Sequence, residues 1–189
     1  MRSPTARSLL SIIAAIAFLQ GCSDDDDGTV GHSGDIAINQ NLSQGDVVAG
    51  ALANEKNITT ESGNPCGKFI NDAETVLGRP PSSIRVDEVM IELTIGDVGI
   101  TGLSSLWDGV VTVSFVTPLM AVPVAEGPVA ASTGPIFLPV TAIPSDFDPV
   151  IDDIVACNYA VRVSGNAAAG LPGTFNATVA VTVNLSALP

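Results

Sequence analysis

The chain is short of the residues on which most enzyme sites depend. It has one histidine among 189 residues, His32, and this residue lies in a polar stretch ahead of the predicted folded domain. Sites of the Ser-His-Asp and Cys-His types need a histidine beside the nucleophile, so they are excluded from the rest of the chain as usually built. No GxGxxG or GxxxxGK[ST] stretch is present, so nucleotide binding has no support.

Positive charge and aromatic rings are also scarce. Seven Lys and Arg stand against twenty Asp and Glu, and aromatic residues make up 4% of the chain. Such a surface repels nucleic acid and offers no basic patch to neutralise phosphates, so nucleic-acid binding is excluded. Sites that cleave sugars with paired carboxylates are normally lined with aromatic rings, which makes a carboxylate-based hydrolase the least favoured function here.

One apolar run is present at the start of the chain. Arg2 and Arg7 precede the run, which covers residues 9–19, and this layout is typical of an export signal. The run is shorter than the roughly 20 residues that a membrane-spanning helix needs. The sequence therefore predicts an exported protein.

The residues after this run, Leu19-Gln20-Gly21-Cys22, resemble the lipobox of bacterial lipoproteins. The resemblance implies that residues 1–21 are a signal peptide, that cleavage makes Cys22 the N-terminus, and that palmitate-type acyl chains on Cys22 hold the protein on a membrane. Two or three such chains give stable anchoring, because each buried methylene contributes about 0.8 kcal/mol. Ser23, in place of an aspartate, implies an outer-membrane destination in the cell envelope.

Residues 22–34 are predicted to form an acidic tether. The run Asp24–Asp27 fits a solvated, self-repelling spacer between the lipid and the domain. It also looks like the surface-export signal of some bacterial lipoproteins, and both interpretations stay open. Residues 35–189 are then long enough for a single folded domain with its own core.

Two cysteines remain once Cys22 is assigned to lipid. In an oxidising compartment, Cys66 and Cys157 are predicted to form one disulfide. The rival hypothesis is a reactive thiol at Cys66, at the start of a predicted helix that would lower its pKa. No nearby histidine supports that rival.

Most of the domain shows the alternation of β-strands. Apolar residues recur at every second position in four segments, which are residues 84–95, 111–115, 159–163 and 175–185. A one-residue slip at Asp87-Glu88 predicts a β-bulge. Alternation leaves one wet face per sheet, so we expect a mainly β fold, an antiparallel β-sandwich.

Helices are expected only in the N-terminal part of the domain. Residues 66–77 carry a clear apolar stripe ended by Gly78, and residues 46–56 show a weaker helical spacing with Asp46 as N-cap. Residues 165–173 should link the last two strands as a hairpin. Six prolines between residues 118 and 144 restrict strands there to sheet edges or irregular pieces.

Two features are candidates for a site. Asp146, Asp148, Asp152 and Asp153 lie within eight residues, and such a loop either binds calcium through its oxygens or is a solvated acidic loop. Trp107 lies at a predicted turn before a strand, where it either contacts a partner or closes the end of the core. No cofactor is expected beyond this calcium hypothesis.

The function expected from these features is binding at a membrane surface. The leading hypothesis is an envelope lipoprotein that acts as a binding or interaction module, an adhesin or an accessory subunit of an envelope assembly, for an unknown envelope protein or glycan. A structural surface-coat lipoprotein without a specific ligand is the alternative. Trp107 is the first choice for a partner contact and the 146–153 acids are the second.

Overall fold

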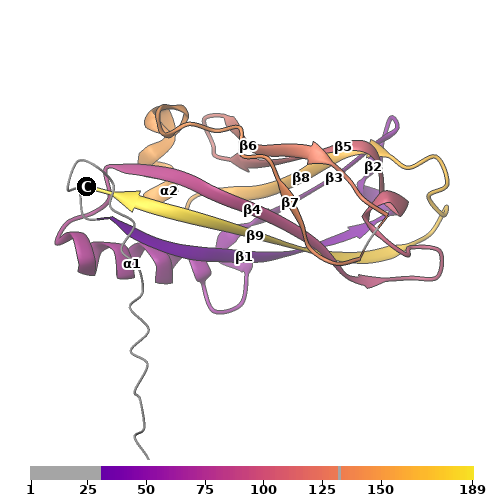
Figure 1. Ribbon diagram of the computed structural model, residues 1–189, viewed down its shortest axis with the longest axis horizontal. Coiled ribbons are helices and arrows are strands. Elements are labelled where there is room, and N and C mark those ends of the chain that lie inside the picture. The colour runs from indigo at the N-terminus through magenta and orange to yellow at the C-terminus, as the bar shows by residue number, and fades with distance from the viewer. Residues whose placement is uncertain (1–30, 132) are drawn as a thin grey trace, which may run out of the picture.

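Two antiparallel sheets pack face to face in the computed structural model, which describes residues 31–131 and 133–189 (Figure 1). The strands are β1 (His32–Ser43), β2 (Val47–Val48), β3 (Ala51–Asn57), β4 (Ser83–Gly96), β5 (Trp107–Val116), β6 (Ala121–Pro128), β7 (Ile136–Leu138), β8 (Ala160–Ala167) and β9 (Asn176–Leu188). One sheet has the order β1-β9-β4-β7 and the other β2-β3-β8-β5-β6. The predicted β-sandwich is confirmed.

The helices of the described residues are few and short. The α-helices are α1 (Pro65–Leu77) and α2 (Ile151–Val155), and the 3-10 segments are η1 (Gln44–Asp46), η2 (Ile58–Thr60), η3 (Leu103–Ser105), η4 (Pro144–Asp146) and η5 (Asp148–Val150). No helix in these described ranges is long and apolar enough to cross a membrane. Helix α2 lies in the C-terminal half, where no helix was predicted.

Helix α1 matches its prediction because its ends are well specified by the sequence. Asn64 accepts a hydrogen bond from the Gly67 N–H at 3.1 Å, Pro65 occupies the first turn, and Gly78 ends the helix with a φ of 70°. A left-handed residue at this position favours glycine. The buried face, which includes Phe69 and Ala73, lies along β1.

The core fills the space between the two sheets. Strand β9 shows why: its odd-numbered residues from Ala177 to Leu185 are buried while Thr178 and Thr182 are not. Strand β9 pairs with both β1 and β4, so it is a central strand with one face in the core. The predicted bulge is present, as a register shift between Val86 and Glu88.

The predicted helix over residues 46–56 is wrong. Ala49 and Gly50 both have positive φ, at 50° and 83°, which makes the tight turn between β2 and β3. Two consecutive residues in this region are typical of a hairpin turn. Asp46 accepts hydrogen bonds from the N–H and Oγ of Ser43, so it caps the short 3-10 segment instead.

The predicted hairpin of the last two strands is also wrong. Strand β8 pairs with β3 and β5, whereas β9 pairs with β1 and β4 in the other sheet. Residues 168–175 therefore cross from one sheet to the other. Both strands are apolar enough to be central, and a central strand pairs with a neighbour on each side. Here each of the two strands has both of its neighbours among other strands of its own sheet.

The two strands of the proline-rich segment lie at the sheet edges, as predicted. Strand β6 is the edge of one sheet and β7 the edge of the other. The chain after β7 also crosses over to β6, where the Thr141 N–H donates to the Val124 carbonyl at 3.0 Å. This crossing covers part of the β6 edge and leaves its first residues open.

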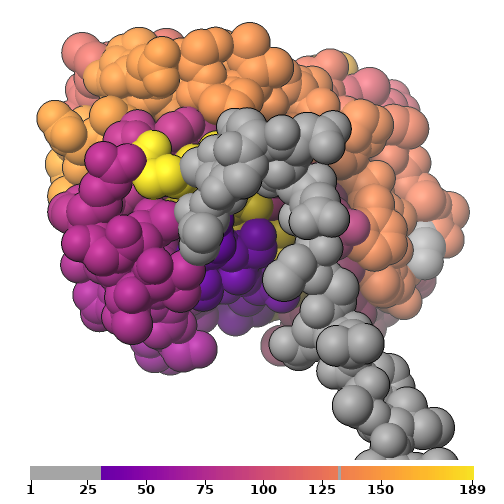
Figure 2. Space-filling view, turned by 60° about the vertical axis from the view of Figure 1, so that its left-hand side comes forward, coloured from indigo at the N-terminus to yellow at the C-terminus, as the bar shows by residue number. Residues whose placement is uncertain are grey.

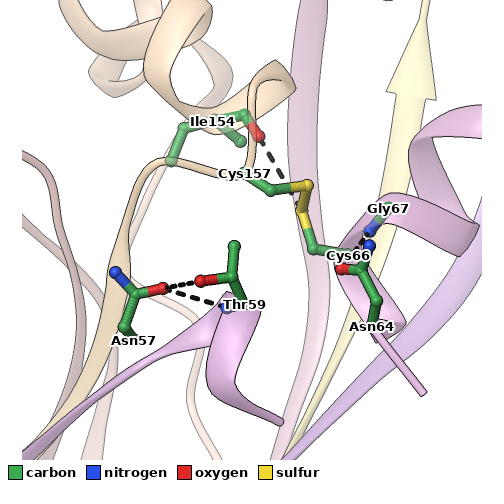
Figure 3. The surroundings of a disulfide bond; sticks show 7 residues. All are labelled: Asn57, Thr59, Asn64, Cys66, Gly67, Ile154 and Cys157. Carbon is green, nitrogen blue, oxygen red and sulfur yellow. Dashed lines mark hydrogen bonds between the residues drawn. A yellow bond between two sulfur atoms is a disulfide. The ribbon is translucent and has the colours of Figure 1, made fainter. Parts of the chain in front are cut away.

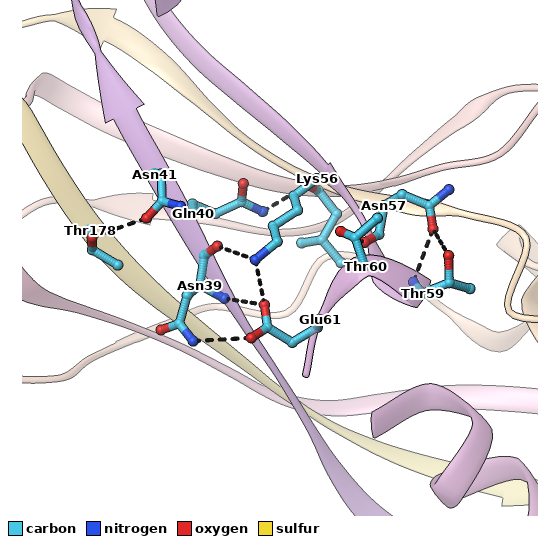
Figure 4. A network of polar contacts seen from close by, with 10 residues as sticks. Asn39, Gln40, Asn41, Lys56, Asn57, Thr59, Thr60, Glu61 and Thr178 are labelled. Atoms are coloured by element: carbon cyan, nitrogen blue, oxygen red, sulfur yellow. Dashed lines mark hydrogen bonds and ion pairs between the residues drawn. The ribbon is translucent and has the colours of Figure 1, made fainter. Parts of the chain in front are cut away.

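Strand β1 is the other edge of the sheet that ends in β7, and side chains form hydrogen bonds with its backbone at Asn39 (Figure 4). The Asn39 N–H donates to Glu61 at 3.0 Å, and Lys56 Nζ donates to the Asn39 carbonyl at 3.1 Å. Lys56 and Glu61 are themselves paired at 2.7 Å. Next to them, the buried Gln40 side chain donates to the Val161 carbonyl at 2.8 Å and so links the two sheets.

The Cys66–Cys157 disulfide is present, and its Cα atoms are 5.9 Å apart (Figure 3). It joins the first turn of α1 to the turn between α2 and β8, where Cys157 has a φ of 55°. Both cysteines are buried. The reactive-thiol hypothesis for Cys66 is therefore wrong, because its sulfur is bonded.

Candidate binding groove

Trp107 does not form a surface contact. Its side chain is fully buried and its indole N–H donates to the Leu52 carbonyl at 3.0 Å. Trp107 is the first residue of β5 rather than part of a turn. Its indole is amphipathic, and the N–H group is hydrogen-bonded inside the domain. The hypothesis of a partner contact at Trp107 is wrong, and the alternative that it closes the core holds.

The four aspartates of the 146–153 segment do not form a calcium site. Asp146 accepts a hydrogen bond from the Ile143 N–H at 2.8 Å, and Asp153 accepts one from Asn158 at 2.8 Å. Across residues 31–131 and 133–189, no group of three or more His, Cys, Asp and Glu side chains is placed to hold a metal ion. The calcium hypothesis fails because η4, η5 and α2 spread these side chains along separate turns.

The structure instead places the acidic segment beside an apolar groove. Its volume is about 450 Å³, within the range of roughly 300–1,000 Å³ typical of ligand pockets. The lining residues come from the β5–β6 turn, the open start of β6 and the segment leading to η5, and they are Met120, Ala121, Val122, Pro123, Thr141, Ser145, Asp146 and Pro149. Asp146 is the sequence-predicted site residue that reaches the groove.

Exposed apolar side chains line this groove or lie beside its lining residues in the sequence. Leu119 is 67% exposed, Met120 43% and Ile143 59%. Apolar residues are scattered singly over any surface, but three of them beside one hollow are the pattern of an interaction site. The groove therefore offers both a depression and an apolar rim.

The β5–β6 turn that carries part of this rim is held by one threonine. The Thr117 side chain accepts hydrogen bonds from the N–H groups of Leu119 and Met120, both at 3.2 Å, and donates to the Met120 carbonyl at 3.1 Å. Thr117 is itself buried. A turn fixed in this way keeps Leu119 and Met120 exposed. Because the turn is already ordered, it would lose little conformational entropy when a partner binds.

The groove lies at the end of the sandwich that carries α2. Val116 pairs with Ala121 across the β5–β6 turn and with Ala160 at the start of β8, just after α2. Figure 1 shows α1, the start of β1 and the C-terminus at this same end. In Figure 2, which turns this end forward, the orange surface of the segment before β8 lies above the magenta surface of α1.

A smaller cleft at this end contains the histidine. His32 was expected in the tether, but it is the first residue of β1 and its ring centroid lies 5.5 Å from that of Phe69. The folded region thus starts before residue 35. The cleft has a volume of about 250 Å³ and is lined partly by Asp35 and Lys68. Beside the histidine, Ser33 Oγ is 2.8 Å from Ser186 Oγ, its partner across the β1–β9 pair.

One buried group and one half-buried group have shifted pKa values for structural reasons. Burial raises the pKa of the Tyr159 hydroxyl well above its ordinary value. For Glu61, burial raises the pKa, but hydrogen bonds from Lys56 and Asn39 outweigh it, so the pKa is lowered from 4.5. Both residues lie away from the groove residues, in the core and at the β1 edge.

Comparisons with known proteins give no functional lead. No protein-family model matches the chain, and no curated protein matches it. Among solved structures, a chain from Desmodium yellow mottle tymovirus is 10% identical, with 98% of this chain and 95% of that chain covered and a TM-score of 0.25. A likeness at this TM-score carries no argument about fold or function.

Proposed function

We propose that the chain is a lipid-anchored protein of the bacterial envelope whose β-sandwich is a binding module, with the apolar-rimmed groove as its binding surface. The anchor is Cys22, through the lipobox resemblance, and the outer membrane is the proposed destination. The observation that carries the binding role is the exposure of Leu119, Met120 and Ile143 around one hollow. Such exposed apolar surface is stabilised when a partner covers it.

The position of the groove supports action near the membrane surface. Nine residues separate Cys22 from His32, where β1 begins. A fully extended chain of this length spans at most about 35 Å. The groove lies at the same end of the sandwich as the start of β1 (Figure 1), so a Cys22 anchor would hold the groove within reach of other membrane-associated molecules.

The chemistry at the groove favours binding over catalysis. The carboxylate nearest the groove, Asp146, is engaged by the Ile143 N–H. A general base needs a free carboxylate or imidazole within reach of substrate. The only histidine lines a different cleft, against Phe69. The groove itself supplies apolar surface, two hydroxyls and one carboxylate that already has a structural role.

Site-specific photo-crosslinking in intact cells tests the proposal. A photoreactive residue is placed at Leu119 or at Ile143, on the rim, and in a control chain at Val98, which is 100% exposed in the loop after β4. We expect discrete crosslinked products from the rim positions and none from Val98. Equal labelling at all three positions, or no product at the rim, would contradict a binding role for the groove.

A further inference from the structure

Positive charge is missing from a long part of the folded chain. Residues 86–161 contain no Lys, Arg or His, while they contain ten acidic residues. This stretch runs from β4 to the start of β8 and supplies every residue that lines the groove. The charged residue that lines the groove is therefore an acid, Asp146, and no basic residue near it in sequence offsets its charge.

Four of the five Lys and Arg residues after residue 35 pair with carboxylates elsewhere, and Arg79 is the fifth. The ion pairs in the described part of the chain include Lys56–Glu61 at 2.7 Å, Lys68–Asp72 at 4.0 Å, Arg85–Asp87 at 2.6 Å and Arg162–Glu55 at 2.6 Å. Among the described residues, Asp148 and Asp152 have no such partner, and both are exposed. Negative charge next to the groove is thus left for an external cation.

We infer that the groove binds a cationic, apolar segment of a partner protein, in which Lys or Arg side chains reach the 146–152 acids while an apolar side chain enters between Met120 and Ile143. This inference rests on the proposed binding function and adds the chemistry of the partner. Apolar contact supplies the affinity, whereas the charges set the choice of partner and the rate of encounter.

A membrane surface fits the same groove less well. Bacterial and other anionic lipid surfaces attract clusters of Lys and Arg, and residues 86–161 have none. Insertion of Leu119 and Ile143 into such a surface would bring Asp146 and Asp148 against lipid phosphates. Like charges at close range oppose this arrangement.

Fluorescence anisotropy with short labelled peptides tests the inference on the full-length protein, purified in a non-ionic detergent with empty micelles as blank. The probes are a Lys–Leu peptide, a Glu–Leu peptide and a Lys–Ser peptide. Vesicles of phosphatidylglycerol and of phosphatidylcholine are tested for co-sedimentation in parallel with the protein from Ser23 onward, because acyl chains on Cys22 would bind any vesicle by themselves. We expect binding of the Lys–Leu peptide alone, and weaker binding as salt rises from about 0.05 M to about 0.3 M.

Variants locate the peptide on the surface. The double variant D148N/D152N should weaken binding about two- to fivefold per charge removed, as exposed ion pairs do, and I143S should weaken it without changing the salt dependence. The control D108N removes an exposed acid at the start of β5, at the far end of the sandwich, and should leave binding unchanged.

The outcomes separate the inference from the function on which it rests. Equal binding of the Glu–Leu peptide, equal effects of D108N and D148N/D152N, or binding of vesicles in place of peptide would each overturn the cationic partner. If crosslinks still form at Leu119 and Ile143 in cells, the binding function stands with a partner of other chemistry. If these crosslinks are missing, the proposed function fails as well.

Discussion

Removal of the Cys66–Cys157 disulfide should lower the free energy of unfolding by about 4–5 kcal/mol. The two cysteines are 91 residues apart. Closing a loop of this length removes about 15 cal/mol/K of entropy from the unfolded chain, or about 4.6 kcal/mol at 25 °C in the loop-closure description. The bond links α1 to the region of α2, so its loss frees two elements that otherwise share one covalent contact (Figure 3).

Urea unfolding of the C66A/C157A variant measures this effect. The slope of free energy against urea should also rise, because an unfolded chain without the crosslink is more expanded and exposes more surface. Reducing agent should weaken the native protein and leave the variant unchanged, which controls for the lost sulfur packing. A decrease below about 2 kcal/mol with an unchanged slope would refute the reasoning from loop closure.

Three further predictions follow from single contacts. Trp107→Phe removes the donor to the buried Leu52 carbonyl and should lower the free energy of unfolding by about 2–4 kcal/mol; an unchanged urea midpoint would show that this hydrogen bond contributes nothing. The folded-state pKa of Glu61 is lowered from 4.5, so the stability that it contributes is complete above that pH and is lost as the pH falls through the folded-state value. Glu61→Gln should flatten this acid loss in melting curves recorded below about pH 4.5, whereas an identical pH profile would exclude a role for the Lys56 pair. Cys22→Ser should leave the protein without its acyl mass and with its signal uncut or miscut; a native protein that stays in the aqueous phase without that mass would end the lipid-anchor proposal.

The sequence predicts this fold where one physical rule dominates. The period-two pattern of residues 175–185 and the stripe of residues 66–77 both correspond to observed elements, β9 and α1, because each buries one face on the core. The Cys66–Cys157 disulfide, which was predicted for a chain in an oxidising compartment, is present. Edge positions for β6 and β7 followed from proline, which cannot donate to a central ladder.

The pairing of strands that lie far apart in the sequence could not be predicted from local sequence patterns. The spacing of residues 46–56 is compatible with a helix, and only the pairing of β3 with β8 decides for strands. Likewise, alternation in β8 and β9 shows that each is a half-buried strand but not which sheet it joins. Strand registry depends on neighbours far away in sequence, which a periodicity does not encode.

The candidate groove was predicted only in part. Asp146 was expected at a site, but Leu119, Met120 and Ile143 were missed, because they lie in a proline-rich stretch without regular alternation. The Thr117-Pro118 pair was the available signal, since a threonine two residues before an exposed position braces a turn through its hydroxyl. For Trp107 the sequence left both a partner contact and a place in the core open, because an indole at a strand end can face inward or outward with the same sequence pattern.

The side chains along the β1 edge have a consequence for crowding. A domain confined to the plane of a membrane meets its own copies at high effective concentration, and an open strand edge then invites sheet-to-sheet fusion. Here the Asn39 N–H and carbonyl are already bonded to Glu61 and Lys56, while Pro123 and Pro128 remove donors from β6. Dense display on a surface would therefore find these positions of β1 and β6 closed to pairing with a second copy.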